Sequence, residues 1–390
     1  MEKIAFFIKK SINSLYRINF RLDLNKNNDF LIWDLELSDD VKKLIDSKYS
    51  CQVIARRNEI DVPLRIGFIL YIFKTIIKGL ILPIPYLVAC YLSPKILLTY
   101  IDNSLNYKYI KLLNPDIRLI SIQNGTRYDF MMINHVGFEF DVYLGFGQVE
   151  KEIMEKAGII VNKYYPFGAL SLCSRDTYNL VVESRYDIIF ISDIVSADFH
   201  SKNSSKEYKL FYALYEKYTR IICNFLDIIA NETGLRIAIA MRTEQIDKGH
   251  DIEFELYSHF KNLICIPRKG KSSYQHCINS NLVITIGSTL GYEMLGMNKK
   301  VIFCNGISDI SNASFKSPFL KNCYIDYLKD KYLIRVVDLK SFKDKILTMM
   351  ECPLHSHLAD IEFIKIKYMN FIDSENYKSE FNYIVKELIS

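Results

Sequence analysis

The sequence predicts an α/β protein with two parallel-sheet halves, and three observations support this fold class. First, the chain has 390 residues, and a single hydrophobic core stops growing at roughly 250 to 300 residues. Second, short apolar runs alternate with helical or mixed segments in both halves, as parallel strands with crossover helices require. Third, a Pro and a Gly interrupt the pattern in residues 165–168. We therefore expect two Rossmann-like domains, residues 1–168 and 169–350, with a cleft between them.

The expected strands are apolar runs rich in β-branched residues. In the first half they are Phe30–Trp33, Ile96–Ile101, Leu119–Gln123 and Val142–Phe146. In the second half they are Asp187–Ser192, Leu235–Met241, Leu263–Pro267, Leu282–Ile286 and Val301–Cys304, with a long helix at about Glu207–Ala230. The tail from Leu358 to Ser390 has a helical pattern, so residues 351–390 are expected to form a C-terminal helical segment.

Composition excludes extended disorder and any need for a nucleic-acid partner. Hydrophobic residues make up 49% of the chain and charged residues 24%, which is ordinary for a folded protein. The formal net charge of +5 is mild. It suits a protein that handles phosphorylated donors or rests near an anionic membrane.

The nine cysteines are an odd number, widely scattered and without a CxxC pair. This pattern favours a reduced cytosolic protein over a disulfide framework, and it lacks zinc-site spacing. No DxD pair follows a predicted strand, so the sequence indicates no divalent metal and no other cofactor.

The apolar segment Ile66–Leu92 allows three interpretations. It is long enough for a transmembrane helix, but Lys74 and Lys78 lie inside it and two prolines interrupt it. A buried helix followed by a strand is the simplest alternative. In a third interpretation the segment contacts the inner membrane from the cytoplasmic side, because the lysines could meet anionic headgroups.

The run from Leu282 to Asn305 joins a buried strand, a small-residue turn, a helix and a second strand. Gly287, Ser288 and Thr289 form the turn, and the backbone N–H groups at a helix N-terminus bind anions such as phosphate. Glu293 follows one helical turn after Thr289, so its carboxylate can accept hydrogen bonds from sugar hydroxyls. This run therefore predicts a binding site for a phosphorylated sugar.

Polar residues end several of the other predicted strands, where ligands collect in open α/β sheets. Any single one is often only a helix cap or turn residue, but they recur at the same end of the strands. They are Asp102, Asn103, Gln123, Asn124, Ser192, Asp193, Arg242, Arg268 and Lys269. Arg242, Arg268 and Lys269 suit a nucleotide phosphate or a sugar carboxylate, with solvated surface as the alternative.

Asp102 is the first candidate for a reacting carboxylate, and Asp193 is the second. Either could act as a general base that deprotonates an attacking hydroxyl, which inverts configuration at the reacting carbon. Alternatively, either could act as a nucleophile that forms a covalent intermediate, which retains configuration. Asp102 could equally be an N-cap for a helix that begins near Leu105. Glu139 and Asp141 are weaker candidates, and His135 is more simply a half-buried structural histidine.

Two short sequence motifs carry a family resemblance, QNG at residues 123–125 and STLGYE at residues 288–293. The strand, the Gly-Ser-Thr turn, Glu293, Gly296 and the following Lys-Lys-Val strand resemble the donor half of GT-B glycosyltransferases. The segments around Asp102 and Gln123 resemble bacterial surface-carbohydrate biosynthesis proteins, some of which are similar to Kdo transferases. The resemblance covers roughly residues 95 to 305.

This resemblance implies a metal-independent GT-B glycosyltransferase. It also implies that the C-terminal helical segment, residues 351–390, packs back on the first domain. The turn and Glu293 would hold a nucleotide-sugar donor, with a CMP-ulosonic acid such as CMP-Kdo favoured over a UDP-sugar. The N-terminal half, with Asn103, Gln123 and Asn124, would meet an oligosaccharide or lipid-linked acceptor of capsule or O-antigen synthesis. Nucleotide-sugar 2-epimerases and polyol-phosphate transferases share the architecture and remain alternatives, as does a non-catalytic scaffold of a membrane assembly complex.

Overall fold

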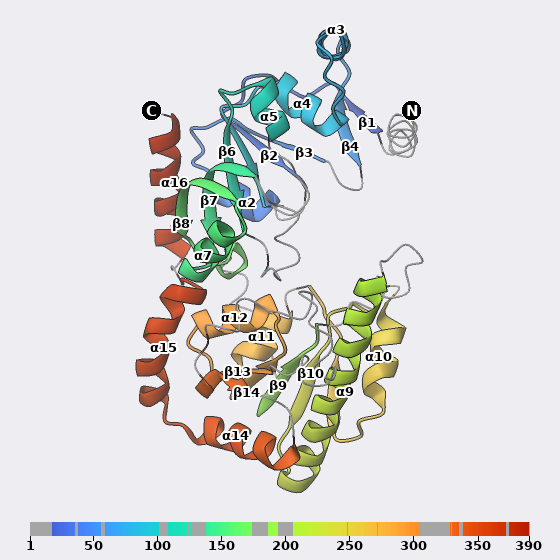
Figure 1. The fold of residues 1–390 in the computed structure, drawn as a ribbon, viewed down its shortest axis with the longest axis vertical. Helices are drawn as coiled ribbons and strands as arrows, with labels where there is room; N and C mark the ends of the chain where they lie inside the picture. Colours follow the sequence, from blue (N-terminus) through green and yellow to red (C-terminus); the bar gives the residue numbers. More distant parts are fainter. Residues whose placement is uncertain are drawn as a thin grey trace.

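The computed structural model describes residues 18–35, 38–55, 59–100, 108–123, 125, 138–173, 186–193, 206–247, 249–270, 272–304, 328, 330–334, 338–371 and 374–389. Two six-stranded sheets, both with parallel strand pairing, form the centres of an upper and a lower half in Figure 1. The expected α/β fold class with two Rossmann-like halves is confirmed.

The first sheet has the strand order β3-β2-β5-β6-β7-β8. Its strands are β2 (Phe30–Trp33), β3 (Cys51–Ile54), β5 (Ile96–Thr99), β6 (Arg118–Ile122), β7 (Glu139–Gly145) and β8 (Ile160–Pro166). The helices of this half are α2 (Ser38–Leu44), α3 (Ile66–Ile77), α4 (Ile84–Leu92), α5 (Lys108–Leu113) and α7 (Gln148–Lys156). A separate parallel pair, β1 (Ile18–Arg21) and β4 (Ile60–Pro63), lies beside the sheet and leads into α3.

The second sheet has the order β11-β10-β9-β12-β13-β14. Its strands are β9 (Ile188–Ile191), β10 (Ile237–Ala240), β11 (Leu263–Ile266), β12 (Leu282–Thr285), β13 (Val301–Cys304) and β14 (Leu333–Ile334). Its helices are α9 (Lys206–Thr233), α10 (His250–Ser258), α11 (Ser272–Ile278), α12 (Thr289–Gly296) and α14 (Leu339–Glu351), with the 3-10 turn η5 (Asp330–Tyr332). Another 3-10 turn, η1 (Leu170–Cys173), follows β8 and packs on α2 of the first half. In chain order this arrangement is 3-2-1-4-5-6, the order of the dinucleotide-binding Rossmann fold.

The strand order fixes where ligands can bind. In open parallel sheets they bind beyond the carboxyl ends of the two strands at which the strand order reverses. The connections that leave these two strands run to opposite sides, so a crevice is left between them. In the second sheet these strands are β9 and β12, which are hydrogen-bonded neighbours. Their carboxyl ends face the junction of the two halves, where α11 and α12 lie opposite α7 (Figure 1).

The C-terminal helices cross from the second half back to the first, as expected. Helix α15 (Leu354–Tyr368) packs on α12 and α7, and α16 (Ser374–Ile389) packs on α2 and η1. Between them, Asn370 donates from its backbone N–H to the Phe146 carbonyl at 2.8 Å and from its side chain to the Pro166 carbonyl at 2.6 Å. The crossing is therefore attached to the first sheet at two strand ends.

The crossing fits only because glycines face it. A side chain at Gly147 would place its Cβ 2.4 Å from the Lys367 carbonyl oxygen, and one at Gly168 would lie 2.1 Å from the Asn370 carbonyl oxygen. Gly168 also has a φ of +83°, which favours glycine. The Pro-Gly signal read from residues 165–168 thus marks the point where the end of β8 meets the C-terminal crossing.

One sequence interpretation is wrong. The segment Ile66–Leu92 was expected, in its simplest form, to be a buried helix followed by a strand. It forms two helices, α3 and α4, separated by a break that ends at Pro83, and much of α3 is exposed. Pro83 is the N-cap of α4 and Pro85 lies in its first turn, where a missing N–H costs nothing. No helix in the described part of the chain combines the length and the apolar character that crossing a bilayer demands.

Candidate functional site

The predicted phosphate turn lies at the carboxyl end of β12, beside the end of β9. Ser288 is the N-cap residue of α12, with extended backbone, and its side chain makes no capping hydrogen bond. Gly287 is buried, whereas Ser288 and Thr289 are partly exposed. The sheet therefore places the turn at the crevice where a Rossmann fold binds nucleotides.

Asp193 follows β9 and binds the turn that follows β12. Its Oδ2 accepts hydrogen bonds from the Tyr215 hydroxyl at 2.8 Å, the Gly287 backbone N–H at 3.2 Å and the Thr285 hydroxyl at 3.4 Å. Burial raises the pKa of Asp193, and the hydrogen bond from Tyr215 and the positive charge of Arg242 oppose that increase. The carboxyl group therefore holds a proton more readily than an ordinary aspartate, which lowers its repulsion of a phosphate.

Arg242 stands at the same crevice. Its guanidinium donates to the Asp193 backbone carbonyl at 3.4 Å, and its side chain is otherwise exposed. Two of the predicted site residues, Asp193 and Arg242, are thus brought together with the turn. Arg268 and Lys269 are exposed after β11, where Arg268 pairs with Glu244 at 3.5 Å and the Lys269 N–H donates to Ser272.

Glu293, the predicted sugar ligand, points toward the first half of the chain. It is 4% exposed, and its Oε1 accepts a 2.7 Å hydrogen bond from the hydroxyl of Ser171 in η1. Tyr274 in α11 also contacts this carboxylate, and burial together with the charge of Glu293 raises the pKa of Tyr274 well above its usual value. Two protein hydroxyls thus surround the carboxylate that was expected to bind sugar hydroxyls.

Sequence reasoning missed Glu253, which shapes this edge of the sheet. The carboxylate is fully buried in α10 and accepts four hydrogen bonds of 2.6 to 2.9 Å, from the Ser192 hydroxyl, the Arg242 N–H, and the Thr243 N–H and hydroxyl. It thereby fixes the loop that carries Arg242. Its signal in the sequence is a glutamate in the first turn of a helix that follows a strand, where a carboxylate can accept backbone N–H groups.

Of the acceptor-side residues predicted from the sequence, Gln123 lies in the described part of the chain. Gln123 follows β6 and is buried, and its side chain donates to Glu150 of α7, which also accepts from the Phe146 N–H at 2.7 Å. These contacts give Gln123 a structural role in the described residues. Asp141 lies within β7 and forms an ion pair with Lys111 at 2.6 Å. Asp102, Asn103, Asn124 and His135 lie outside the described residues.

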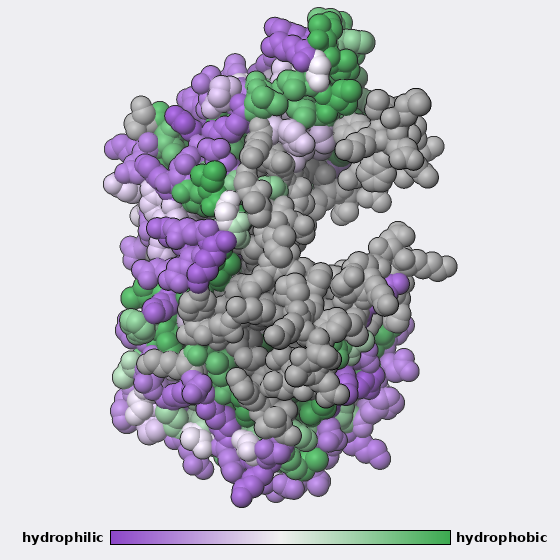
Figure 2. All heavy atoms as spheres, in the orientation of Figure 1, coloured by the Kyte–Doolittle hydropathy of each residue, from purple (hydrophilic) through white to green (hydrophobic). Residues whose placement is uncertain are grey.

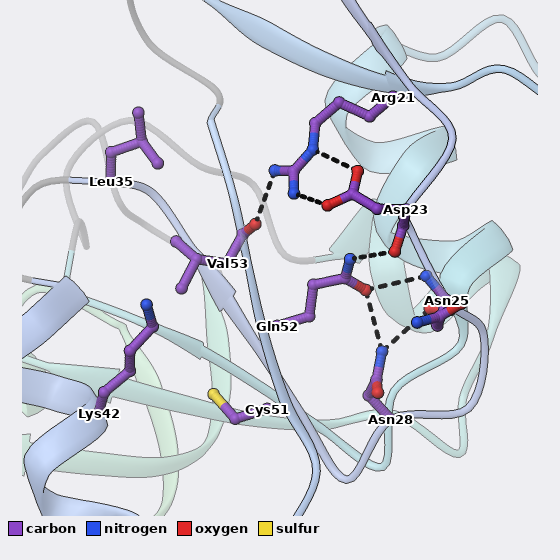
Figure 3. Close-up of a pocket in the computed structure, with 9 residues that line it drawn as sticks. All are labelled: Arg21, Asp23, Asn25, Asn28, Leu35, Lys42, Cys51, Gln52 and Val53. Carbon is purple, nitrogen blue, oxygen red and sulfur yellow. Dashed lines mark hydrogen bonds and ion pairs between the residues drawn. The ribbon is translucent and has the colours of Figure 1, made fainter.

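A pocket of about 420 Å³ opens beside β1 and β3, away from this crevice. Figure 3 shows its polar side chains bonded to one another. Arg21 binds Asp23 through Nε at 2.9 Å, and Gln52 accepts from the Asn25 backbone and from the Asn28 side chain. Because these polar groups satisfy each other, they have little remaining capacity to bind a ligand.

Metal-ligand chemistry is sparse in the described residues, where no three His, Cys, Asp or Glu side chains gather closely enough to hold an ion. Buried thiols such as Cys223 and Cys304 have raised pKa values because of burial, so they behave as small apolar groups.

The two parallel sheets, the strand order of the second sheet and the C-terminal crossing give the chain a GT-B-like fold. The model of a family described as "putative O-antigen biosynthesis protein" matches residues 120–322. The chain belongs to this family. The matched region includes both short sequence motifs, residues 123–125 and 288–293.

Solved structures share the fold at low sequence identity. The wall teichoic acid polymerase TagF is 13% identical with a TM-score of 0.53, covering 100% of this chain and 97% of that one. A protein described as "putative UDP-N-acetylglucosamine 2-epimerase from Listeria monocytogenes" is 10% identical with a TM-score of 0.51, covering 93% and 97%. A glycosyltransferase from Rickettsia africae is 10% identical with a TM-score of 0.50, covering 94% and 99%. No curated protein matches the sequence.

Proposed function

We propose that this protein is a glycosyltransferase of bacterial surface polysaccharide assembly that transfers a sugar from a nucleotide-activated donor. One observation carries the proposal: the predicted phosphate turn, residues 287–289, lies beside the carboxyl end of β9 in a sheet of 3-2-1-4-5-6 order. Membership of an O-antigen biosynthesis family supplies the biological context. The domains proposed are residues 1–168 for the acceptor, residues 169–350 for the donor, and residues 351–390 as the crossing segment.

In the proposed donor site, the N-terminal turn of α12 and the Ser288 and Thr289 hydroxyls bind phosphate oxygens. The phosphate would take over N–H groups that the protein itself now uses, such as that of Gly287, which donates to Asp193, and that of Ser288, which donates to Thr285. Glu293 binds ribose hydroxyls by exchanging its bond with Ser171 for one with the ligand. Arg242 offers paired donors to a second anionic group. A CMP-ulosonic acid carries such a group, the sugar carboxylate, and it is the donor we favour, with CMP-Kdo as the example.

Asp193 is the described candidate for the reacting carboxyl group. A general base works best when its pKa lies near the working pH, and burial shifts the pKa of Asp193 in that direction. Asp102 remains the acceptor-side candidate. We propose that charge on the leaving phosphate is offset by the α12 dipole and Arg242, without a metal ion.

A second candidate function is favoured by the structural relatives. TagF and the Listeria protein described as an epimerase have the same fold at TM-scores of 0.53 and 0.51. Polyol-phosphate transfer or 2-epimerisation would use the same crevice. These activities start from CDP-linked or UDP-linked substrates, so the nucleotide that binds separates them from a CMP-sugar transferase.

The test is a thermal-shift panel of CMP, CDP, UDP and GDP, since a ligand that binds only the folded state raises the melting temperature. At a concentration about 100 times Kd, the stabilisation is roughly 2.7 kcal/mol. A shift with CMP alone supports the ulosonic-acid donor. A shift with UDP or CDP redirects the assignment to the alternatives, and no shift with any nucleotide favours a non-catalytic scaffold.

We also propose that the acceptor is an oligosaccharide or a lipid-linked sugar, and that the protein meets it by peripheral contact with the inner membrane. An acceptor held in a membrane requires the N-terminal half to approach the lipid surface.

A further inference from the structure

Helix α3 carries its apolar side chains on the face that points away from the protein. On a helical wheel at about 100° per residue, the exposed apolar residues fall within an arc of roughly 120°. They are Ile66, Ile69, Leu70, Phe73, Ile76 and Ile77. The two buried residues, Phe68 and Thr75, lie on the opposite side. A helix on a water-facing surface normally has the reverse arrangement, with polar residues outward.

The helix is firmly attached by that opposite side. Phe68 packs edge-on against Tyr91 of α4, with ring centroids 5.1 Å apart, and Tyr71 lies 5.7 Å from the same ring. A Cβ at Gly67 would lie 2.9 Å from the Tyr91 hydroxyl. Helix α3 thus has a fixed orientation with its apolar face outward, and it projects from the end of the first half (Figure 1). Figure 2 shows this apolar tip over α3.

The charge around the apolar face has one sign. Residues 62–101 contain no acidic residue, and their basic residues are Arg65, Lys74, Lys78 and Lys95. Lys74 and Lys78 are exposed beside the apolar arc. Twelve residues span only about 18 Å, which is too short to cross a bilayer but sufficient to lie along its surface. An outward apolar face edged by lysines fits the interface of a membrane with anionic lipids.

We infer that α3 is the membrane-binding element, which inserts Ile69, Phe73, Ile77 and their apolar neighbours among the acyl chains of an anionic bilayer. The lysines then face the phosphate headgroups. This inference rests on the proposed membrane-borne acceptor for its biological purpose, although the binding itself requires no nucleotide.

The experiment is flotation of the full chain with vesicles of phosphatidylcholine alone and of phosphatidylcholine mixed with phosphatidylglycerol. The test variant is the double substitution Ile69→Ser and Phe73→Ser, at residues 51% and 59% exposed. The matched control is Phe363→Ser and Ile366→Ser on α15, at residues 60% and 51% exposed. A third variant, Lys74→Gln and Lys78→Gln, removes only charge.

We expect the wild type and the α15 control to float with the mixed vesicles, and the α3 variant to lose about tenfold or more of this partitioning. The lysine variant should bind the mixed vesicles more weakly than the wild type does, and its behaviour with vesicles of phosphatidylcholine alone should equal that of the wild type. Wild-type behaviour of the α3 variant, or no flotation of the wild type, would overturn the inference. A dimer in light scattering that the α3 substitutions dissociate, without vesicle binding, would assign the face to a second copy instead.

Nucleotide thermal shifts measured on the same α3 variant separate the two proposals. A retained shift shows that the variant is folded and that its donor site is intact. Vesicle binding in a protein that no nucleotide stabilises would contradict the proposed function and leave the role of α3 standing.

Discussion

The hydroxyl of Ser171 donates a 2.7 Å hydrogen bond to Oε1 of Glu293, and this bond joins residues 122 positions apart. It connects η1, after the last strand of the first sheet, to α12 of the second sheet. A serine hydroxyl offers the same donor chemistry as a sugar hydroxyl. The bond therefore represents the interaction that we propose a donor ribose would replace.

Replacing Ser171 by Ala should tighten nucleotide binding, because the ligand no longer competes with a protein hydroxyl. We expect an affinity gain of about fivefold, together with a loss of about 1 kcal/mol in the free energy of unfolding. Calorimetric titration and urea unfolding measure the two quantities. Ser258→Ala, at an exposed position on α10, is the control and should change neither. Unchanged affinity in the Ser171 variant would remove Glu293 from the proposed donor site.

Asp193→Asn should stabilise the protein near neutral pH. The folded-state pKa of Asp193 is raised, mainly by burial. Its contribution to stability is therefore fully present below the unfolded pKa and is lost as the pH rises through the folded pKa. The amide avoids this loss, so the variant should melt roughly 2 to 4 °C above the wild type at pH 7. Melting curves from pH 4 to pH 8 should show this difference growing with pH, and a difference that shrinks would contradict the assignment.

The apolar strands of both sheets could be predicted because their residues are covered on both faces. Phe30–Trp33 and Val301–Cys304 were predicted with the observed bounds. Strand β8 was missed because it is an edge strand whose residues are largely exposed or half-buried and include Asn162 and Lys163. Strand β3 was missed because only one of its four residues is fully buried.

The site could be predicted only where it is local in sequence. The turn of residues 287–289 and its helix follow from one short run. The bonds of Glu293 to Ser171 and of Asp193 to Gly287 span 122 and 94 positions. Local sequence patterns give no signal for contacts between residues so far apart. The exposed face of α3 was hidden for another reason: an apolar pattern does not reveal whether its partner is the protein core or something outside it.

Glu253 should be essential for the order of the Arg242 loop. Glu253→Ala leaves the Ser192 hydroxyl and the N–H groups of Arg242 and Thr243 without their carboxylate acceptor, at a cost of about 3 kcal/mol in the free energy of unfolding. Glu255→Ala is the matched control, because this glutamate is exposed on the same helix. Urea unfolding compares the two variants, and equal stability would show that the buried network contributes little.

Gly168→Ala should be far more costly than Gly234→Ala, although both glycines have positive φ, +83° and +72°. At Gly234 nothing lies within 4 Å of the added Cβ, so only the backbone preference is lost, about 1 kcal/mol. At Gly168 the Cβ meets the Asn370 carbonyl, and the crossing segment must move. We expect a loss above about 3 kcal/mol by urea unfolding. Equal losses of unfolding free energy in the two variants would show that the crossing segment moves away from residue 168 at little cost.

The central claim, a nucleotide site at the β9–β12 crevice, is tested most directly by calorimetric titration of Glu293→Gln with the nucleotide that stabilises the wild type most. Gln52→Ala, in the pocket beside β3, is the control. The account predicts that Glu293→Gln weakens binding by about tenfold or more while Gln52→Ala binds like the wild type. Wild-type affinity in the Glu293 variant, or a loss confined to the Gln52 variant, would contradict it.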